Sequence, residues 1–331
     1  MPNLSLSKTW NYLATSTIER ISPFISDVVT GRVFLLHVLD QSGMRQRVNG
    51  GTQLVLRLLN ELPSATDYSD LDALNPSRAN PVEAAIYNWK QFAVPIQISG
   101  RDMLINSGSD VAMTNILTLF VEAAIASARN HAGGSNGIFS ANTEANRGIT
   151  GLQNLLTHVS NAAPTTGTAG NLDRATRTYW RNRVVNVASD FSANGYDGMI
   201  DLYTQCQRGD ETPGVIALTR AAYFNYLRNS ISSIRFNVPL TAQQKTLDIG
   251  FSNVTFLNAI IGPDDGVPAN QGYFINPKYA HWMVHSMREF ELGPVAFTPS
   301  LDALSGWLYF AGNLGLSAMQ PHGLLLNADT N

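Results

Sequence analysis

His281 and His285 have the spacing in this sequence that most resembles a metal-binding pair. Two imidazoles four positions apart would share one face of a helix, as the zinc ligands of metalloproteases do. The segment His-Trp-Met-Val-His, however, lacks the glutamate that follows the first histidine in those enzymes, and no third ligand is evident in the sequence. We therefore interpret the pair as structural residues that flank Trp282 and Met283, and we predict no metal site.

Asp264 and Asp265 are a second candidate, because adjacent carboxylates could bind a cation. They lie in the segment Gly-Pro-Asp-Asp-Gly, and a turn of this composition requires no ion. Cys206 is the only cysteine, which excludes an intrachain disulfide and a cysteine-based zinc site. Because a thiol needs a nearby cation to become reactive, we interpret Cys206 as a small buried apolar residue.

The motifs of common enzyme classes are missing from the sequence. It contains neither a Walker loop nor G-x-S-x-G, and the glycines of the segment 100–111 do not match a dinucleotide fingerprint. We therefore predict that the protein has no catalytic residue, binds no cofactor and is not an enzyme. The alternative of another class, a cytosolic α/β enzyme, would need a pocket with converging titratable groups, and we identify none.

Charge is scarce throughout the 331 residues. Only 14% of them are charged and the net charge is −3, whereas an average globular chain is about a quarter charged. The four lysines and the arginines form no basic stripe that would neutralise nucleic-acid phosphates, so we expect no sequence-specific recognition of DNA or RNA. A surface poor in charge suits a protein that is largely covered by copies of itself.

The sequence also argues against export and membrane insertion. Residues 1–20 lack the charged segment and apolar core of a secretory signal. The longest apolar stretch without charge, residues 111–121, is too short to span a bilayer. We expect a soluble protein that is made in a reducing cytoplasm and has no membrane partner.

Residues 52–60 and 86–99 are rich in β-branched and bulky apolar side chains and are predicted to be strands. The segment between them, 61–85, contains prolines and aspartates and is typical of an irregular, polar tip. Together they predict a long hairpin, and a ribbon of two strands cannot bury both of its faces within its own chain. We therefore expect Trp89 and Phe92 to contact a neighbouring subunit, with packing inside the subunit as the alternative.

Residues 109–130 are the clearest helix of the sequence, because apolar side chains recur three and four positions apart. Ser109 can cap its start, and Gly133 ends it. At 1.5 Å per residue the helix would span roughly 33 Å. The side chains expected on its buried face are Met113, Ile116, Leu117, Phe120, Ala124 and Ala128.

The second half of the chain alternates helices and strands, which indicates an α/β or α+β arrangement. A loop is expected at residues 160–171, and Asn276 followed by Pro277 predicts the start of a helical turn. Near the end, residues 307–310 and 323–326 are expected to form a strand pair. Helices are predicted over 196–207 and 219–226, and strands over 214–218, 247–261 and 272–275.

The order of these elements resembles that of the HK97-like major capsid proteins of tailed phages. In both, an N-terminal arm and a long hairpin precede a long helix, an α/β block and returning strands. The resemblance covers about residues 50–327 and is carried by several short motifs. They are Tyr179-Trp180-Arg181-Asn182, Tyr203 to Gly209 with Pro213, Thr219 to Tyr226, Arg235-Phe236, Gly250-Phe251, Tyr273 to Asn276, Gly312-Asn313-Leu314 and Gly323.

The resemblance implies an α+β, HK97-like capsid fold with five segments. They are an N-terminal arm at residues 1–45, an E-loop hairpin at 46–100, a P-domain with a long spine helix at 101–185, an A-domain at 186–300 and returning P-domain strands at 301–331. Residues 317–320 depart from the family, because relatives often carry arginines there. The hairpin tip has no lysine, so the Lys–Asn isopeptide bond of some relatives is not expected.

The function that the resemblance implies is structural. Copies would form pentamers and hexamers that close into the icosahedral head of a tailed phage and enclose double-stranded DNA without sequence specificity. The protein would be part of the virion capsid after assembly in the host cytoplasm, with scaffolding, portal and decoration proteins as further partners. The alternative is an encapsulin-like nanocompartment shell with an enzyme cargo, and the contents of the particle would distinguish the two.

Overall fold

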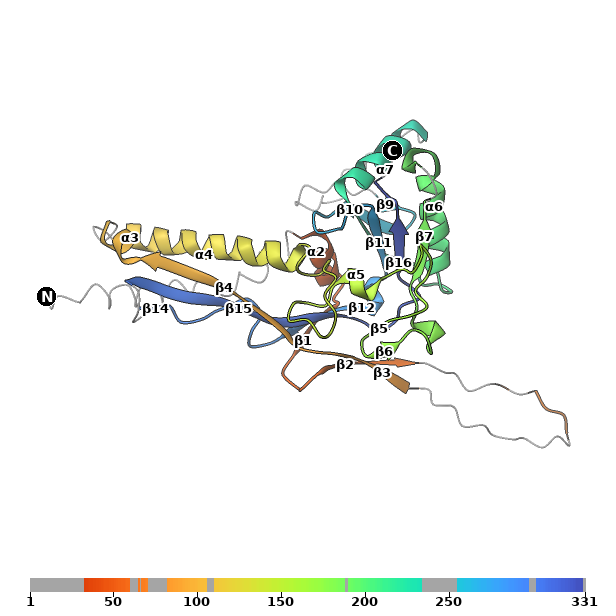
Figure 1. Ribbon diagram of the computed structural model, residues 1–331, viewed down its shortest axis with the longest axis horizontal. Helices are drawn as coiled ribbons and strands as arrows, with labels where there is room; N and C mark the ends of the chain where they lie inside the picture. Colours follow the sequence, from red (N-terminus) through yellow and green to blue (C-terminus); the bar gives the residue numbers. More distant parts are fainter. Residues whose placement is uncertain are drawn as a thin grey trace.

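The chain combines helices and sheets in an elongated molecule, as the computed structural model shows (Figure 1). One end is a limb in which a long helix lies on a sheet, and the other end is an upright block of helices and a second sheet. A two-stranded hairpin leaves the junction of the two parts and points away from the limb. The predicted α+β class is thus confirmed. The structure describes residues 33–59, 65, 67–70, 82–105, 110–187, 190–233, 255–297 and 302–329.

The sheet of the limb is organised around one long strand, β15 (Ala303–Leu316). It pairs with β4 (Lys90–Ser99) along residues 303–312, and its last residues pair with β12 (Ala280–His285). Along β4 the even-numbered side chains are more covered than the odd-numbered ones, as the two-residue period of a strand predicts when the long helix packs on one face. The remaining strands of this sheet are β1 (Arg45–Val48), β13 (Glu291–Leu292) and β14 (Ala296–Phe297).

The long helix α4 (Asp110–Gly133) packs along β4 and confirms the predicted helix. Its 24 residues span roughly 36 Å at the standard rise. The predicted burial of Phe120 is wrong, because 36% of its surface is exposed. The apolar stripe is rotated toward Val121 and Ile125, because these buried side chains lie on the side of the helix that packs against the sheet. The buried side chains described on α4 are Leu117, Val121, Ala124, Ile125, Ala128 and Ala132.

The block is built on a second six-stranded sheet in the order β7-β16-β11-β8-β10-β9. Its helices α6 (Phe191–Cys206) and α7 (Arg220–Ser233) extend the two predicted helices and pack on this sheet. The predicted pairing of residues 307–310 with 323–326 is wrong, because β15 and β16 belong to different sheets. The strands are β7 (Arg183–Asn186), β8 (Val215–Leu218), β9 (Thr255–Phe256), β10 (Ala259–Pro263), β11 (Gln271–Ile275) and β16 (Gly323–Leu326).

The hairpin consists of β2 (Leu54–Leu59) and β3 (Val82–Tyr87), which pair antiparallel. The first predicted strand, 52–60, is confirmed, but its predicted partner, 86–99, is wrong: β2 pairs with Val82–Tyr87, most of which was expected in the irregular tip. After Asn88 and Trp89 the chain continues as β4, which belongs to the sheet of the limb. The predicted tip, 61–85, lies mostly outside the described residues.

The inner face of the hairpin is covered by its own chain. The expectation that the chain cannot bury both faces of this ribbon therefore applies to the outer face. Leu56 and Tyr87 are buried there beside the end of β15, and the Tyr87 hydroxyl both donates to the Leu316 carbonyl and accepts from its N–H. The outer face stays open. The other buried residues of the inner face are Leu54, Leu58 and Ala85.

Short elements complete the fold. Residues 1–32 of the predicted N-terminal arm lie outside the described part of the chain, as does Ser109, whereas residues 33–45 include the buried helix α2. The Asn276 side chain accepts from the Lys278 N–H, which confirms the predicted helical turn. The five segment boundaries stay predictions. These elements are α2 (Phe34–Gln41), α3 (Gly100–Ile105), α5 (Leu152–Leu155), β5 (Thr168–Ala169), β6 (Leu172–Asp173), η1 (Thr178–Trp180) and η2 (Pro277–Tyr279).

Candidate functional site

The two histidines with metal-like spacing lie on strand β12 and not on a helix. Residues four apart on a strand are separated by roughly 13 Å, too far for both to bind one ion. The ring of His281 hydrogen-bonds Gln46 and Ser317, and burial lowers its pKa. His285 packs edge-on against Trp89, with 5.3 Å between ring centroids. Each histidine therefore has its own structural contacts, as the sequence predicted.

Cys206 is buried at the end of α6. Burial raises the pKa of its thiol to about 12, and the positive charge of Arg183 opposes this only in part. At neutral pH the side chain is therefore a thiol and not a thiolate, and only the thiolate is a strong nucleophile. The interpretation of Cys206 as a small buried apolar residue is confirmed.

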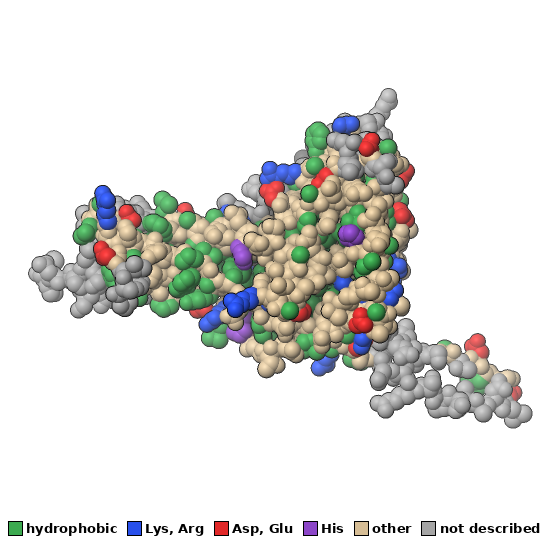
Figure 2. Space-filling model, viewed as in Figure 1, with side chains coloured by type: hydrophobic (Ala, Val, Ile, Leu, Met, Phe, Trp, Pro, Cys, Tyr) green, Lys and Arg blue, Asp and Glu red, His purple; other side chains and the backbone are tan. Residues whose placement is uncertain are grey.

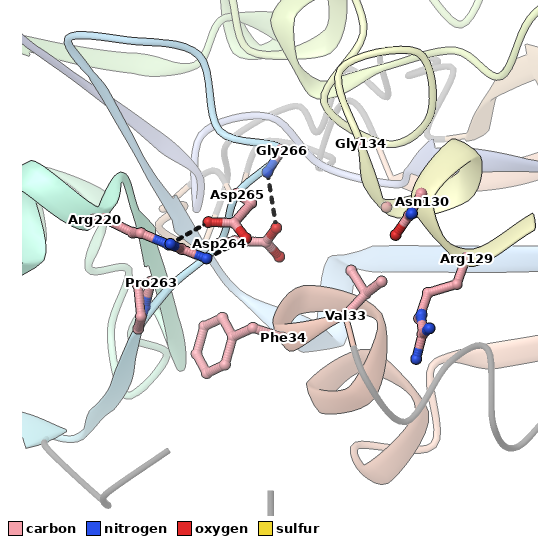
Figure 3. A pocket seen from close by; sticks show the side chains of 11 residues that line it. Val33, Phe34, Arg129, Asn130, Gly134, Arg220, Pro263, Asp264, Asp265 and Gly266 are labelled. Atoms are coloured by element: carbon pink, nitrogen blue, oxygen red, sulfur yellow. Dashed lines mark hydrogen bonds and ion pairs between the residues drawn. The ribbon is translucent and has the colours of Figure 1, made fainter. Parts of the chain in front are cut away.

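The acidic pair lies on the wall of a cavity of about 510 Å³ between α2, the end of α4 and β10 (Figure 3). Asp264 accepts hydrogen bonds from the N–H groups of Leu35 and Gly266, and burial raises its pKa to about 6. Asp265 is turned instead toward Arg220, with which it forms an ion pair. The two carboxylates thus bind different partners. Among the residues described, no group of three or more His, Cys, Asp or Glu side chains could hold a metal ion.

Trp89 and Phe92, the predicted contacts with a neighbour, both pack within the subunit. The Phe92 ring stacks on Phe310 with 4.9 Å between centroids, and it also touches His131 of α4. The Trp89 indole donates to the Gly51 carbonyl over 2.8 Å, and its ring remains partly exposed. Much of each side chain is therefore packed inside the subunit, which is the alternative that the sequence left open. Their contact with a neighbouring subunit stays a prediction.

The hairpin leaves an apolar surface open to solvent. On its outer face, Val55 pairs with Ile86 and Arg57 pairs with Ala84, beside Val82. Val82 and Val55 are both more than half exposed, and Arg57 is the only charged side chain described on this face. We call these five residues the hairpin outer face. Apolar side chains gathered on an exposed surface mark sites of protein–protein contact.

The limb carries a second exposed apolar surface. Figure 2 shows hydrophobic side chains gathered along it, at the level of α4. We call the exposed residues Leu104, Ile105, Leu119 and Phe120 the limb surface; Leu119 is 67% exposed. Trp307 adds an exposed aromatic ring on the far side of the limb sheet. The sequence prediction missed the limb surface because it assigned Phe120 to the core. The signal that could have indicated the surface was Leu119, an apolar residue that lies outside the predicted apolar stripe.

No protein-family model matches this chain, and no curated protein matches it either. Solved structures do match. The capsid asymmetric unit of cyanophage A-1(L) is 14% identical, with a TM-score of 0.56 over 88% of this chain and 93% of that one. The capsid of an empty GTA particle is 11% identical, with a TM-score of 0.57 over 86% and 88% of the two chains. The capsid of Myoviridae phage XM1 is also 11% identical, with a TM-score of 0.53 over 87% and 90%.

The chain has the HK97-like capsid fold. The assignment of the limb to the P-domain, the block to the A-domain and the hairpin to the E-loop stays a prediction. Strands β12, β13 and β14, which were expected in the A-domain, belong to the sheet of the limb. Several motif residues of the resemblance are buried: Trp180 donates to the Ala169 carbonyl, and Asn182 donates to the Thr157 carbonyl. These two motif residues therefore serve packing within this chain. Among the described residues no helix is both long and apolar enough to cross a membrane.

Proposed function

We propose that this protein is the shell-forming subunit of a tailed-phage head. Copies assemble into pentamers and hexamers, and these close into an icosahedral shell that encloses double-stranded DNA. The observation that carries the proposal is the extent of the structural match, which includes 93% of the cyanophage capsid chain and joins limb, block and hairpin in one arrangement. We infer that the protein acts through assembly and not through catalysis.

The exposed apolar surfaces support this proposal. The hairpin outer face and the limb surface lie on parts that extend from the block in opposite directions (Figure 1). A subunit of this shape can contact neighbours on both sides through different surfaces, and such heterologous contacts form closed rings when the rotation matches the symmetry. We propose that Trp89 and Phe92 support the hairpin at its base, where the exposed part of Trp89 also contacts a neighbouring subunit.

In this proposal the shell encloses DNA without recognising its base sequence. On the face shown in Figure 2, basic and acidic side chains are interspersed and form no continuous basic stripe. A shell that encloses DNA needs no base-specific contacts, whereas specific binding would require several phosphate-neutralising side chains on one surface. Scaffolding, portal and decoration proteins are further proposed partners, with assembly in the host cytoplasm.

Electron microscopy of the purified protein tests the proposal. We expect hollow particles of uniform outline, and light scattering should show masses far above that of a 36.0 kDa subunit. Particles from infected or induced cells should contain nuclease-protected DNA, whereas a protein cargo without DNA would indicate a nanocompartment. A protein that remains monomeric at high concentration, with and without a scaffolding partner, would contradict the proposal.

A further inference from the structure

The hairpin joins the limb through Asn88 and Trp89. Before these two residues the chain pairs with β2 as strand β3, and after them it pairs with β15 as strand β4. The backbone thus changes from one sheet to another within two residues. We call the segment 88–90 the joint.

Lys90, the last residue of the joint, is only 4% exposed. Its ammonium group donates to the carbonyls of Thr143, Glu144 and Asn146, over 3.4, 2.8 and 2.5 Å. An ammonium group has three hydrogens, so the three carbonyls use its whole donor capacity. Burial lowers the pKa of Lys90, and the negative charge of Glu144 opposes that shift. Three carbonyls converge on one point only in one conformation of the loop, so Lys90 fixes the shape of residues 143–146.

Glu144 reaches back from this loop to the joint. Its carboxylate accepts from the Asn88 N–H over 2.7 Å and from the Thr150 hydroxyl over 2.5 Å. On β15, Asn313 completes the contact: its amide donates to the Asn88 carbonyl over 2.9 Å, while its oxygen accepts from the Thr150 N–H. Asn88 is therefore held at both of its backbone groups. The side chains of Lys90 and Glu144 cross in opposite directions, each binding the backbone of the other's segment.

The other strand of the hairpin enters through glycines. Gly50 and Gly51 have φ angles of +135° and +111°, and a β-carbon on Gly50 would meet nothing within 4 Å. Backbone of this kind is readily available only to glycine and offers little resistance to rotation. On the side of β2, the Gly51 carbonyl accepts a hydrogen bond from the Trp89 indole. Because Trp89 belongs to the joint, this contact also depends on the position of the joint. A cavity of about 330 Å³, lined by Gln53, Asn88 and Glu144 among others, lies beside the joint.

We propose that Lys90 and Glu144 are positioning residues that lock the joint and thereby fix the direction in which the hairpin leaves the subunit. The proposal rests on the proposed function, because the direction matters only if the hairpin contacts a neighbouring copy. A shell of one size requires the same contact geometry in equivalent copies, since an altered rotation between subunits changes how the assembly closes. Loss of the lock should therefore give particles of mixed size from subunits that are still folded.

Glu144→Gln is the test variant, because it keeps the shape of the side chain but removes its charge. Glu122→Gln, at an exposed position of α4, is the matched control. Thr150→Val is a second, milder variant that removes the hydroxyl, which donates to Glu144 and accepts from the Asn313 amide. Hydrogen exchange of the Asn88 amide reports the joint in the unassembled subunit, and electron microscopy reports particle diameters. Circular dichroism verifies that each variant is folded.

We expect Glu144→Gln to speed exchange at Asn88 by about tenfold or more, because a hydrogen bond to a charged acceptor is stronger than one to a neutral amide. We also expect several particle diameters where the wild type and Glu122→Gln give one. Unchanged exchange at Asn88, or one wild-type diameter, in a folded Glu144→Gln protein would overturn the proposal. If Glu144→Gln does not fold, hydrogen exchange at Asn88 and the particle diameters of Thr150→Val decide whether the proposal holds.

The failure of assembly itself has a different signature. If the wild-type protein forms no particles, the proposed function fails, and the assembly role of the joint fails with it. Faster exchange at Asn88 in Glu144→Gln would then still show that the residue locks the joint of the isolated subunit. If the wild type does form uniform particles and the variants form the same ones, only the positioning role is refuted.

Discussion

The block and the limb each contain a six-stranded sheet, but the two sheets differ in how many of their faces the chain itself covers. In the block, all four residues of β8 are buried, because α6 and α7 cover one face of the sheet and α2 lies against the other. In the limb, β4 alternates between covered and exposed side chains, since α4 covers only one face. The second face exposes Pro95, Trp307 and other uncharged residues. The block can therefore complete its core within one chain, whereas the limb retains apolar surface suited to contact with another copy.

The largest effect on subunit stability is expected at Phe274, which is fully buried in β11 of the block. Phe274→Ala should reduce the free energy of unfolding by about 3–5 kcal/mol, because the side chain leaves a cavity in a packed core. Phe224→Ala is the matched control, since this ring is 62% exposed on α7. Urea denaturation of both variants measures the difference, and similar losses in stability for the two would contradict the assignment of Phe274 to the core of the block.

A smaller effect is expected on acidification, through His322, which directly precedes β16. Burial lowers the pKa of its imidazole to about 3, with His281 as a second cause, so the folded protein resists a protonation that the unfolded chain accepts near pH 6.5. Stability should therefore fall as the pH drops below about 6.5 and continue to fall toward pH 3, by on the order of a few kcal/mol.

Thermal melts of the wild type and His322→Asn across this pH range test the expectation. The variant is expected to lose stability at neutral pH, because the His322 ring accepts from the Asn276 N–H in the core. Its stability should nevertheless depend less on pH between 6.5 and 3 than that of the wild type. Parallel pH profiles for the two proteins would show that other groups dominate the acid response.

Phe120 in the limb should contribute less than a core aromatic residue. Phe120→Ala should cost roughly 1 kcal/mol, near the centre of the distribution for single substitutions, because the ring is only partly covered. Leu117→Ala on the same helix should cost about 2–5 kcal/mol, since Leu117 is fully buried. Denaturation curves of the two variants would sharpen the assignment of the helix faces, and a larger loss at Phe120 would reverse it.

The smallest effect on the subunit is expected at Leu119, one of the four exposed residues of the limb surface. Leu119→Asp should change the free energy of unfolding by no more than about 0.5 kcal/mol, as exposed substitutions usually do. Assembly should nevertheless be impaired, because a charge then lies within the apolar limb surface. Ser127→Asp, an exposed position on the same helix, is the control. Light scattering that shows normal particles for Leu119→Asp would exclude the limb surface from the interface.

The amino-acid sequence by itself determined the elements that depend on neighbouring residues along the chain. The apolar period of α4, the strand β11, the cap at Asn276 and the first strand of the hairpin were all predictable. Each of these depends on side chains a few positions apart, which interact in any fold that the chain adopts. The order of the elements was then enough to suggest the capsid fold, because that order carries the topology.

Only the tertiary structure decided which distant segments meet. β4 could have continued the hairpin, but β15, more than 200 residues away in the chain, pairs with it in the limb. The same long-range pairing decided the buried face of α4 and brought Glu144 to the joint beside Lys90. Contacts of this kind leave no period in the sequence, because their partners are selected by packing and by the need to satisfy buried polar groups, and both exist only once the chain has folded.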